Sequence, residues 1–420
     1  MTMLIRLAIR NLFRRRWRTA LTVGGIAVST ALVIWLLSLL LGIYSEMARG
    51  TTSVELGQVQ IHSAEFVERQ SIHHHFPVTP EFTEALAAVE GVEAVAPRII
   101  VSGLVGHEEQ SRISRIKGVD PEREAQVTIL EEALVSGRWL TSEEPQELGP
   151  RQVVLGSVMA RSLDLAVDDE LVVLVQAADG ALGNELLQVQ GIVETGHLMI
   201  DRQTAFMHIE DLRFITALEG EAHEIALTSA LDAAPQVATG VRALLIELGD
   251  TQELVVRPWQ EIATQVYLMV ELAQQVSWWL LFIIFAIAAM GIFNTLRMST
   301  IERRAEFGVM MGIGLSRSRL FLMIVIEGVV LGAVGAVIGG LVGGVSAYLT
   351  GTMGLNLEFF TDAESLTLMG VAFAERIFYE VPPQSVVVPV IGVVVVTTLC
   401  ALWPAVVAIG QEPRDGIAGR

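Results

Sequence analysis

The stretch TALTVGGIAVSTALVIWLLSLLLGIY, residues 19–44, contains no charged residue. A helix needs about 20 apolar residues to cross the hydrocarbon core of a bilayer, so this stretch is long enough to span a membrane. Three further windows have the same character: Trp278–Leu296, Leu320–Leu349 and Val386–Ile409. The chain of 420 residues is 52% hydrophobic and has a mean hydropathy of +0.53, which is high for a soluble protein. We therefore predict a membrane protein with four transmembrane α-helices.

The placement of arginines predicts the orientation in the membrane. The segment before the first span has six arginines and no acid, and the loop between the second and third spans has five arginines and two acids. Cytoplasmic loops carry an excess of basic residues, so we expect both segments, and with them both termini, in the cytoplasm. The long segment between the first two spans is then a large mixed α/β extracytoplasmic domain.

The predicted organisation follows from these spans. It comprises a cytoplasmic basic segment (1–18), transmembrane helix 1 (19–45), the α/β domain (46–265), a stalk with transmembrane helix 2 (266–297), a cytoplasmic loop (298–319), transmembrane helix 3 (320–349), an extracytoplasmic loop (350–385), transmembrane helix 4 (386–409) and a cytoplasmic tail (410–420).

Local patterns within residues 46–265 predict alternating strands and helices. VELGQVQIHS (54–63) alternates as a strand does, and residues 151–175 read as strand, short helix, turn and strand. Thr79 and Pro80 are the residue types preferred at the cap and the first position of a helix. The only cysteine, Cys400, lies in the fourth span, so the domain is expected to fold on an apolar core without a disulfide.

The charge of the domain and its lack of catalytic motifs exclude several functions. Residues 46–265 carry a net charge of −22, which disfavours nucleic acid as a partner. The sequence has no G-x-S-x-G or H-E-x-x-H motif, and its sole lysine, Lys117, is not part of a phosphate-binding loop. We predict no catalytic residue, metal site or cofactor in this chain, and we expect ATP and Mg to be bound by another polypeptide. The run His73–His75 leaves open a metal site or a polar loop.

Two features of the third span call for partners. Glu327 is a carboxylate within an apolar window, and an unpaired charge there costs about 3 kcal/mol. It is a substrate contact or a switch, or it forms a hydrogen bond with Ser, Thr or Asn of a neighbouring helix. Small residues form two rows that permit close helix packing, in this chain or with a second copy: Gly335, Gly339 and Gly343 in one, and Ala336, Gly340 and Gly344 in the other.

Four stretches together resemble one family. They are AIRNLFRRRWRTALTVGGIAVSTALVI (8–34), VVLGSVMARSLDLAVDDELVVLV (153–175), NTLRMSTIERRAEFGVMMGIGLSRSRL (294–320) and LWPAVVAIGQEPRDGI (402–417). They resemble the MacB-type and lipoprotein-releasing ABC transporter permeases, in the same order and over essentially the whole chain. The resemblance implies a four-span permease. Because only 18 residues precede the first span, it also implies a stand-alone permease with a separate ATPase.

The segment IERRAEFGVMMGIG, residues 301–314, is expected to meet that ATPase. We predict a short amphipathic helix over 301–312 along the cytoplasmic face, which matches the coupling helix of the family. Phe307, Met310 and Met311 share one side of this helix and are expected to enter a groove on the ATPase. Glu302, Arg303, Arg304 and Glu306 are expected to fix the register of this contact. The alternative is a helix that rests on lipid headgroups.

The predicted function is that of a permease subunit in the bacterial inner membrane. Two ATPase copies would drive movements of the extracytoplasmic domain, and a second permease chain, identical or homologous, would complete the complex. The expected substrate is a lipoprotein or another amphiphile, and a periplasmic lipoprotein chaperone is a possible further partner. The alternatives are a mechanotransmission exporter of a peptide or lipid, and an FtsX-like activator of a periplasmic cell-wall hydrolase.

Overall fold

The computed structural model describes residues 16–141, 150–249, 254–356, 367–368, 371–372, 376–377 and 381–410. The chain divides into two compact units. The helical unit comprises Met1–Glu46, Glu271–Leu357 and Arg376–Arg420, and the α/β unit comprises Met47–Val270 and Glu358–Glu375. Most of the predicted segments 1–18, 350–385 and 410–420 lies outside the described residues.

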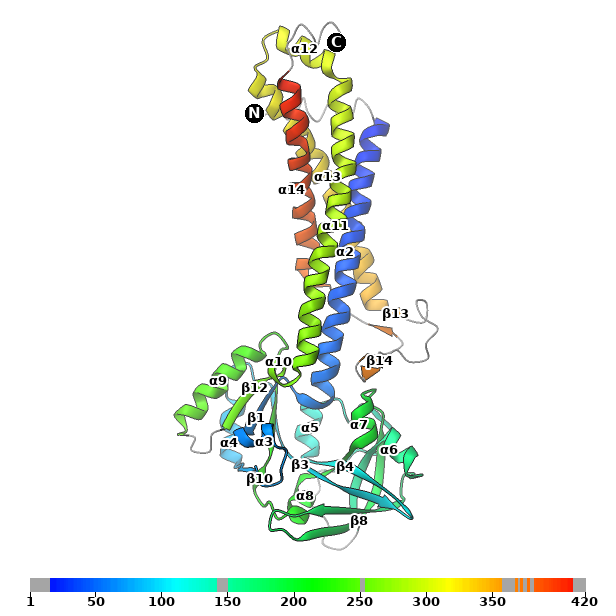
Figure 1. Cartoon of the computed structure of the whole chain (residues 1–420), viewed down its shortest axis with the longest axis vertical. Coiled ribbons are helices and arrows are strands. Elements are labelled where there is room, and N and C mark those ends of the chain that lie inside the picture. The colour runs from blue at the N-terminus through cyan, green and yellow to red at the C-terminus, as the bar shows by residue number, and fades with distance from the viewer. Residues whose placement is uncertain are drawn as a thin grey trace. The chain divides into compact units, whose positions relative to one another are not determined.

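The helical unit is built from four helices that are long and apolar enough to cross a membrane (Figure 1). They are α2 (Arg16–Thr51), α11 (Thr264–Glu302), α13 (Arg317–Met353) and α14 (Pro383–Ile409). The prediction of four transmembrane helices, with an α/β domain between the first and the second, is confirmed. All four helices extend beyond the predicted spans, because the helix continues past the apolar window that defined each span.

The α/β unit is built on one large sheet. In the described residues its strands follow the order β12-β1-β11-β3-β4-β9-β6-β8-β5, and β7 pairs with both β3 and β8. The pairs β4–β9 and β6–β8 are parallel, and the other neighbours are antiparallel. The strands are β1 (Val59–Ser63), β3 (Ala94–His107), β4 (Gln110–Val119), β5 (Leu134–Gly137), β6 (Arg151–Gly156), β7 (Glu170–Gln176), β8 (Leu182–Val193), β9 (Thr204–His208), β11 (Glu224–Thr228) and β12 (Leu254–Pro258).

Short helices connect these strands (Figure 1). They are α3 (Ala64–Glu68), α4 (Pro80–Ala87), α5 (Pro121–Val127), α6 (Ser157–Ser162), α7 (Leu198–Gln203), α8 (Ile209–Thr216), α9 (Ala234–Glu247) and α10 (Trp259–Ile262). The predicted start of α4 is confirmed, because the hydroxyl of Thr79 accepts a hydrogen bond from the backbone N–H of Phe82 and Pro80 is the first helical residue. The predicted strand, helix and strand over 151–175 are confirmed as β6, α6 and β7.

Short two-residue strands complete the described elements. β2 (Phe76–Pro77) pairs with β10 (Glu221–Ala222), β13 (Leu355–Asn356) with β16 (Arg376–Ile377), and β14 (Thr367–Leu368) with β15 (Val371–Ala372).

The two faces of β3 and β4 have different characters. One face carries Val101 and Ile116, which are paired across the strands and lie in a buried apolar cluster. The opposite face carries Arg98 and Lys117, which are also buried. Because side chains alternate along a strand, the register of β3 and β4 places these two basic residues on the same face.

The connection between α2 and the sheet differs from the prediction. The first residues of the predicted strand 54–63 belong instead to a π-helical turn, η1 (Thr52–Leu56), and β1 begins only at Val59. Gly57 ends the turn with a φ of 70°, and a Cβ at this position would lie 3.0 Å from the carbonyl oxygen of Leu227. This conformation and this close approach both favour glycine, so the turn is specified locally.

Candidate functional site

The segment between α11 and α13 forms a separate short helix. The predicted helix over 301–312 is divided, because α11 continues to Glu302 and a second helix, α12 (Arg304–Gly312), follows a break at Arg303. Gly314 has a φ of 100°, which allows the chain to turn from α12 into α13. The structure thus places α12 between two membrane helices.

The apolar side of α12 packs on the protein's own helices. Phe307 is only 1% exposed and belongs to a buried cluster with residues of α13 and α14: Leu320, Met323, Ile324, Ala405 and Ala408. Met310 and Met311 are partly buried against the same cluster. This packing corrects the predicted orientation, in which these three side chains face an ATPase. The apolar stripe of α12 covers the neighbouring ends of α13 and α14 instead.

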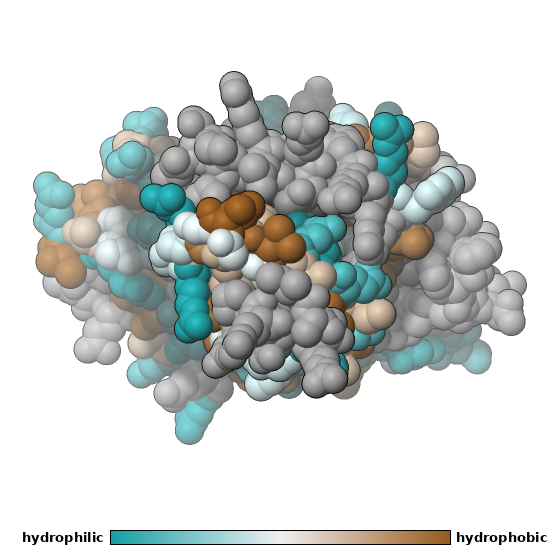
Figure 2. All heavy atoms as spheres, turned by 90° about the horizontal axis from the view of Figure 1, so that it is seen from above, coloured by the Kyte–Doolittle hydropathy of each residue, from teal (hydrophilic) through white to brown (hydrophobic). Residues whose placement is uncertain are grey.

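The outward side of α12 carries a second apolar stripe. Val309 is 53% exposed and Ile313, just after the helix, is 81% exposed. Both follow Ala305 at helical intervals of four residues, and the exposed Arg304 lies at the start of the stripe. Figure 2 looks onto this end of the helical unit and shows hydrophobic and strongly hydrophilic side chains next to one another. This side of α12 therefore has the character of a contact surface.

Glu327 forms an ion pair with Arg303. One guanidinium nitrogen of Arg303 donates to both carboxylate oxygens of Glu327, at 3.0 and 2.8 Å. The side chains are only 11% and 12% exposed. The Arg303 guanidinium also lies 3.3 Å from the Glu306 carboxylate and 5.1 Å from the centre of the Phe307 ring. One predicted alternative for Glu327 was a hydrogen bond to Ser, Thr or Asn; in the structure its partner is Arg303, whose charge neutralises the largely buried carboxylate.

The predicted register residues of α12 are therefore divided between two roles. Arg303 and Glu306 form an ion pair within the chain, whereas the side chain of Arg304 is exposed. The sequence did not show which arginine of the loop pairs with Glu327. The loop contains several arginines, and nothing in the sequence distinguishes the one that lies close to Glu327 in the fold.

The two small-residue rows of α13 pack on different helices of the same chain. A Cβ on Gly339 would lie 2.5 Å from the carbonyl oxygen of Ala27, and Gly335 and Gly343 approach α2 equally closely. A Cβ on Gly340 would lie 2.9 Å from Val390 of α14, whereas one on Gly344 would lie 3.8 Å from Val386. These rows place α13 between α2 and α14.

A groove lies between α2 and α11. It has a volume of about 470 Å³, and its lining is apolar apart from the hydroxyl groups of Thr22, Ser29 and Thr295. The other lining residues are Leu21, Gly25, Ile26, Leu32, Ile284, Ile287, Ala288, Gly291 and Ile292. A groove of this size and character suits an apolar ligand without a charged group.

The histidine run 73–75 does not converge on one point. His74 lies 3.0 Å from Glu65, and His75 lies 3.1 Å from Glu221. Among the residues that the structure describes, no group of three His, Cys, Asp or Glu side chains is arranged to hold a metal ion. His74 and His75 therefore contribute polar contacts that fasten the loop before β2.

Comparison with known proteins agrees with this architecture. Residues 19–245, just over half of the chain, match the family described as MacB-like periplasmic core domain, and residues 278–413 match the FtsX-like permease C-terminal family. Lipoprotein-releasing system transmembrane protein LolC of Neisseria meningitidis serogroup B is 26% identical over 322 residues, which cover 76% of this chain and 74% of that protein. The protein of the same name from Xylella fastidiosa is 23% identical over 404 residues, which cover 94% and 92%.

Two solved structures cover the α/β unit. The periplasmic region of MacB from Actinobacillus actinomycetemcomitans is 14% identical, with a TM-score of 0.36, and the match covers 51% of this chain and 94% of that one. The extracellular domain of the noncanonic ABC-type transporter YknZ from Gram-positive bacteria is 15% identical, with a TM-score of 0.35, and covers 48% and 100%. On the two family matches and the four membrane helices, the chain belongs to the MacB/FtsX-like family of ABC transporter permeases.

Proposed function

We propose that this permease releases lipoproteins from the bacterial inner membrane, using ATP that is hydrolysed by a separate ATPase. The names of its LolC relatives support this substrate class. The observation that carries the proposal is the uncharged groove between α2 and α11. The acyl chains of a lipoprotein are the groups that anchor it in the membrane, and they match this lining in polarity.

The orientation follows the arginine distribution. Both termini and α12 face the cytoplasm, and the α/β unit faces the periplasm, since the basic residues gather before α2 and in the loop that contains α12. Two copies of the ATPase, which bind ATP and Mg, act on two permease chains. The second permease chain, identical or homologous, completes the open side of the groove, and a periplasmic chaperone receives the released lipoprotein.

The ATPase docks on the outward side of α12. Val309 and Ile313 supply exposed apolar contacts, and Arg304 supplies a charge beside them. The inward side is fixed to α13 and α14 through Phe307 and through the Arg303–Glu327 ion pair. A displacement of α12 by the ATPase would therefore move α13 and α14 directly.

Release from proteoliposomes tests the function. We expect the assembled permease and ATPase to transfer a triacylated lipoprotein to a soluble acceptor when ATP is added, and not without ATP. Ser29→Phe should lower release several-fold while ATP hydrolysis continues, because the ring fills the groove. Val28→Phe is the matched control, since Val28 is the neighbouring residue, is exposed and does not line the groove.

Three results would contradict this proposal. Equal release by Ser29→Phe and Val28→Phe would exclude the groove as the acyl site. ATP-dependent movement of a different amphiphile with no lipoprotein release would favour the exporter alternative. Activation of a periplasmic cell-wall hydrolase by the complex, again without lipoprotein release, would favour an FtsX-like role.

A further inference from the structure

The π-helical turn η1 at the end of α2 is held by the α/β unit through its backbone carbonyl groups. The carbonyl of Ser53 accepts from the N–H of Ile129 at 2.9 Å, that of Glu55 from Arg98 at 2.7 Å, and that of Leu56 from the Gln60 amide at 2.8 Å. Carbonyls at a helix end otherwise lack partners within the helix. Three carbonyl groups of the turn are therefore bonded to other parts of the α/β unit, to which the turn belongs.

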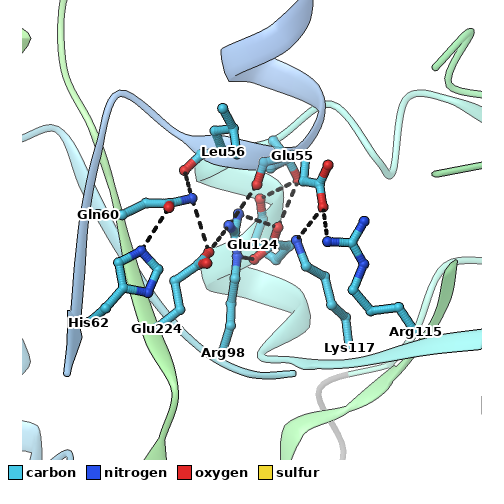
Figure 3. A network of polar contacts seen from close by, with 10 residues as sticks. Glu55, Leu56, Gln60, His62, Arg98, Arg115, Lys117, Glu124 and Glu224 are labelled. Carbon is cyan, nitrogen blue, oxygen red and sulfur yellow. Dashed lines mark hydrogen bonds and ion pairs between the residues drawn. The ribbon is translucent and has the colours of Figure 1, made fainter. Parts of the chain in front are cut away.

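The side chain of Glu55 joins the same attachment (Figure 3). Its carboxylate lies 3.0 Å from Arg115 and 3.4 Å from Lys117, both on β4. Arg98 on β3 donates to Glu124 of α5 at 2.7 and 2.9 Å and to Glu224 of β11 at 2.6 Å. Three cations and three carboxylates thus meet beneath the turn.

Four of these six charged side chains are buried, Arg98, Lys117, Glu124 and Glu224, whereas Glu55 is 17% and Arg115 is 30% exposed. Arg98 is fully buried, and the side chain of Lys117 is only 4% exposed. Burial lowers the pKa of Lys117 in spite of the nearby Glu55 carboxylate. Although burial alone would raise the pKa of Glu224, Arg98 and Lys117 hold it below its usual value. A displacement of the turn relative to the sheet would separate Glu55 from Lys117 and leave the buried ammonium group without its nearest carboxylate, which is unfavourable.

A buried charge cluster is by itself weak evidence for a contribution to stability. Buried ion pairs can often be replaced by apolar residues of similar size without loss of stability, whereas removing one partner is strongly destabilising. Apolar contacts are non-directional, but paired charges fix one position. A cavity of about 250 Å³ adjoins the cluster, but its lining holds three basic residues, Arg115, Lys117 and Arg257, and three acidic ones, Glu55, Glu224 and Glu261. This balanced lining selects no ion.

We propose that Glu55, Arg115 and Lys117 are positioning residues that make η1 a joint that does not slide, through which movement of α2 reaches strands β3 and β4. The inference rests on the proposed function, since it assigns the path by which ATP-driven movement enters the periplasmic domain. The turn follows α2 without a break. Its carboxylate, Glu55, pairs with Arg115 and Lys117 of β4, a strand at the middle of the sheet. A joint of this kind transmits displacement instead of absorbing it.

The test compares stability with transmission in the assembled complex. Glu55→Gln leaves Lys117 without its carboxylate and should lower the melting temperature. The double variant Glu55→Gln with Lys117→Met removes both charges and should regain most of the melting temperature of the wild type. We expect it nevertheless to release about 10-fold less lipoprotein per ATP hydrolysed. Glu219→Gln is the matched control, because it removes one exposed carboxylate of the same unit and should behave as the wild type.

Hydrogen exchange supplies a readout that needs no substrate. In the wild type and in Glu219→Gln, backbone amides of η1, β3 and β4 should exchange at different rates in the ATP-bound and ADP-bound complexes. In the double variant this difference should disappear. Because the exchange does not depend on lipoprotein, the joint is still tested if the wild type releases none.

A double variant with the melting temperature, release ratio and nucleotide-dependent exchange of the wild type would overturn the proposal, since the cluster would then be only structural. A wild-type complex without any nucleotide-dependent exchange in these strands would also overturn it.

Discussion

Two short helical segments of this permease are fastened to their neighbours by different means. α12 is held mainly by apolar packing of Phe307 on α13 and α14, with the Arg303–Glu327 pair beside it. The turn η1 is held by hydrogen bonds to its backbone carbonyl groups and by the carboxylate of Glu55, which pairs with Arg115 and Lys117. Apolar packing loses energy gradually when surfaces shift, whereas a buried charge network holds one register. The difference suggests that α12 tolerates small adjustments and η1 does not.

The largest effect should follow from Arg98→Met. This change leaves Glu124 and Glu224 without their shared cation in a buried site, and removing one partner of a buried pair costs about 3–5 kcal/mol. We expect little folded protein to be recovered, as measured by size-exclusion chromatography in detergent. Arg123→Met is the control, because Arg123 is 42% exposed and pairs with Asp120 at the surface, where such pairs contribute about 0–1 kcal/mol. Equal recovery of both variants would show that the cluster does not fix the turn.

Arg303→Met should have the next largest effect. It removes the cation from the largely buried Glu327 and from the more exposed Glu306, and we expect a loss of about 3 kcal/mol, mostly from Glu327, seen as a lower melting temperature. Combining it with Glu327→Leu should restore most of the loss, because the apolar packing around Phe307 remains. A double variant as unstable as the single one would mean that the ion pair, and not the apolar packing, holds α12.

Lowering the pH tests the buried polar groups around the charge cluster of the α/β unit without any change to Glu55. Next to Glu224, the buried His223 accepts the N–H of Ile100 at Nδ1 and contacts the carbonyl of Ile72 at Nε2. Burial lowers its pKa from 6.5 to about 4. The unfolded chain therefore binds more protons than the folded one between these values, and stability falls as pH falls through this window. At pH 5 the loss from this residue is about 2 kcal/mol.

The melting temperature at pH 7 and pH 5 measures this effect. His223→Gln should show a smaller decrease between the two pH values than the wild type, because the glutamine does not titrate. The buried His62, whose pKa burial also lowers, should cause part of the remaining decrease. If the melting temperatures of the wild type and His223→Gln fall equally between pH 7 and pH 5, His223 does not cause the pH dependence.

The smallest effect concerns the glycine rows of α13, where the closeness of helix packing alone determines whether a larger side chain is tolerated. Gly339→Ala should destabilise by about 1–3 kcal/mol, because its Cβ would lie 2.5 Å from a backbone oxygen of α2. Gly344→Ala should be tolerated, because its Cβ would meet Val386 at an ordinary 3.8 Å. Comparable melting temperatures for these two variants would contradict the close approach of α13 and α2.

The sequence predicted those features that depend on local pattern. Apolar length predicted the four membrane helices, and Thr79 with Pro80 predicted the start of α4, because a cap and a first position are specified by adjacent residues. The prediction of a strand over 54–63 was wrong for its first residues, since the helix of the first span continues into η1 before the sheet starts. Local alternation does not show how far a preceding helix extends.

The candidate sites depended on tertiary partners, and there the sequence was insufficient. It identified an apolar side of α12, but not whether an ATPase or the chain's own α13 and α14 cover it. It singled out Lys117 as the sole lysine, but the pairing with Glu55 arises only from the register of β4 beneath η1. A helical or strand period gives the direction of a side chain relative to its element, and says nothing of which charge from a distant segment it meets.

If a separate ATPase drives this permease through the outward side of α12, co-purification of that ATPase with the permease measures the contact directly. Losing a buried apolar anchor at an interface costs about 2 kcal/mol, which is roughly a 30-fold loss of affinity. Ile313→Asp should therefore strongly reduce the ATPase recovered per permease and should leave the melting temperature of the permease unchanged, since Ile313 is 81% exposed. Ser316→Ala, also exposed and just before α13, should change neither quantity. Full recovery of the ATPase with Ile313→Asp and with Val309→Asp would show that the ATPase docks elsewhere on the permease.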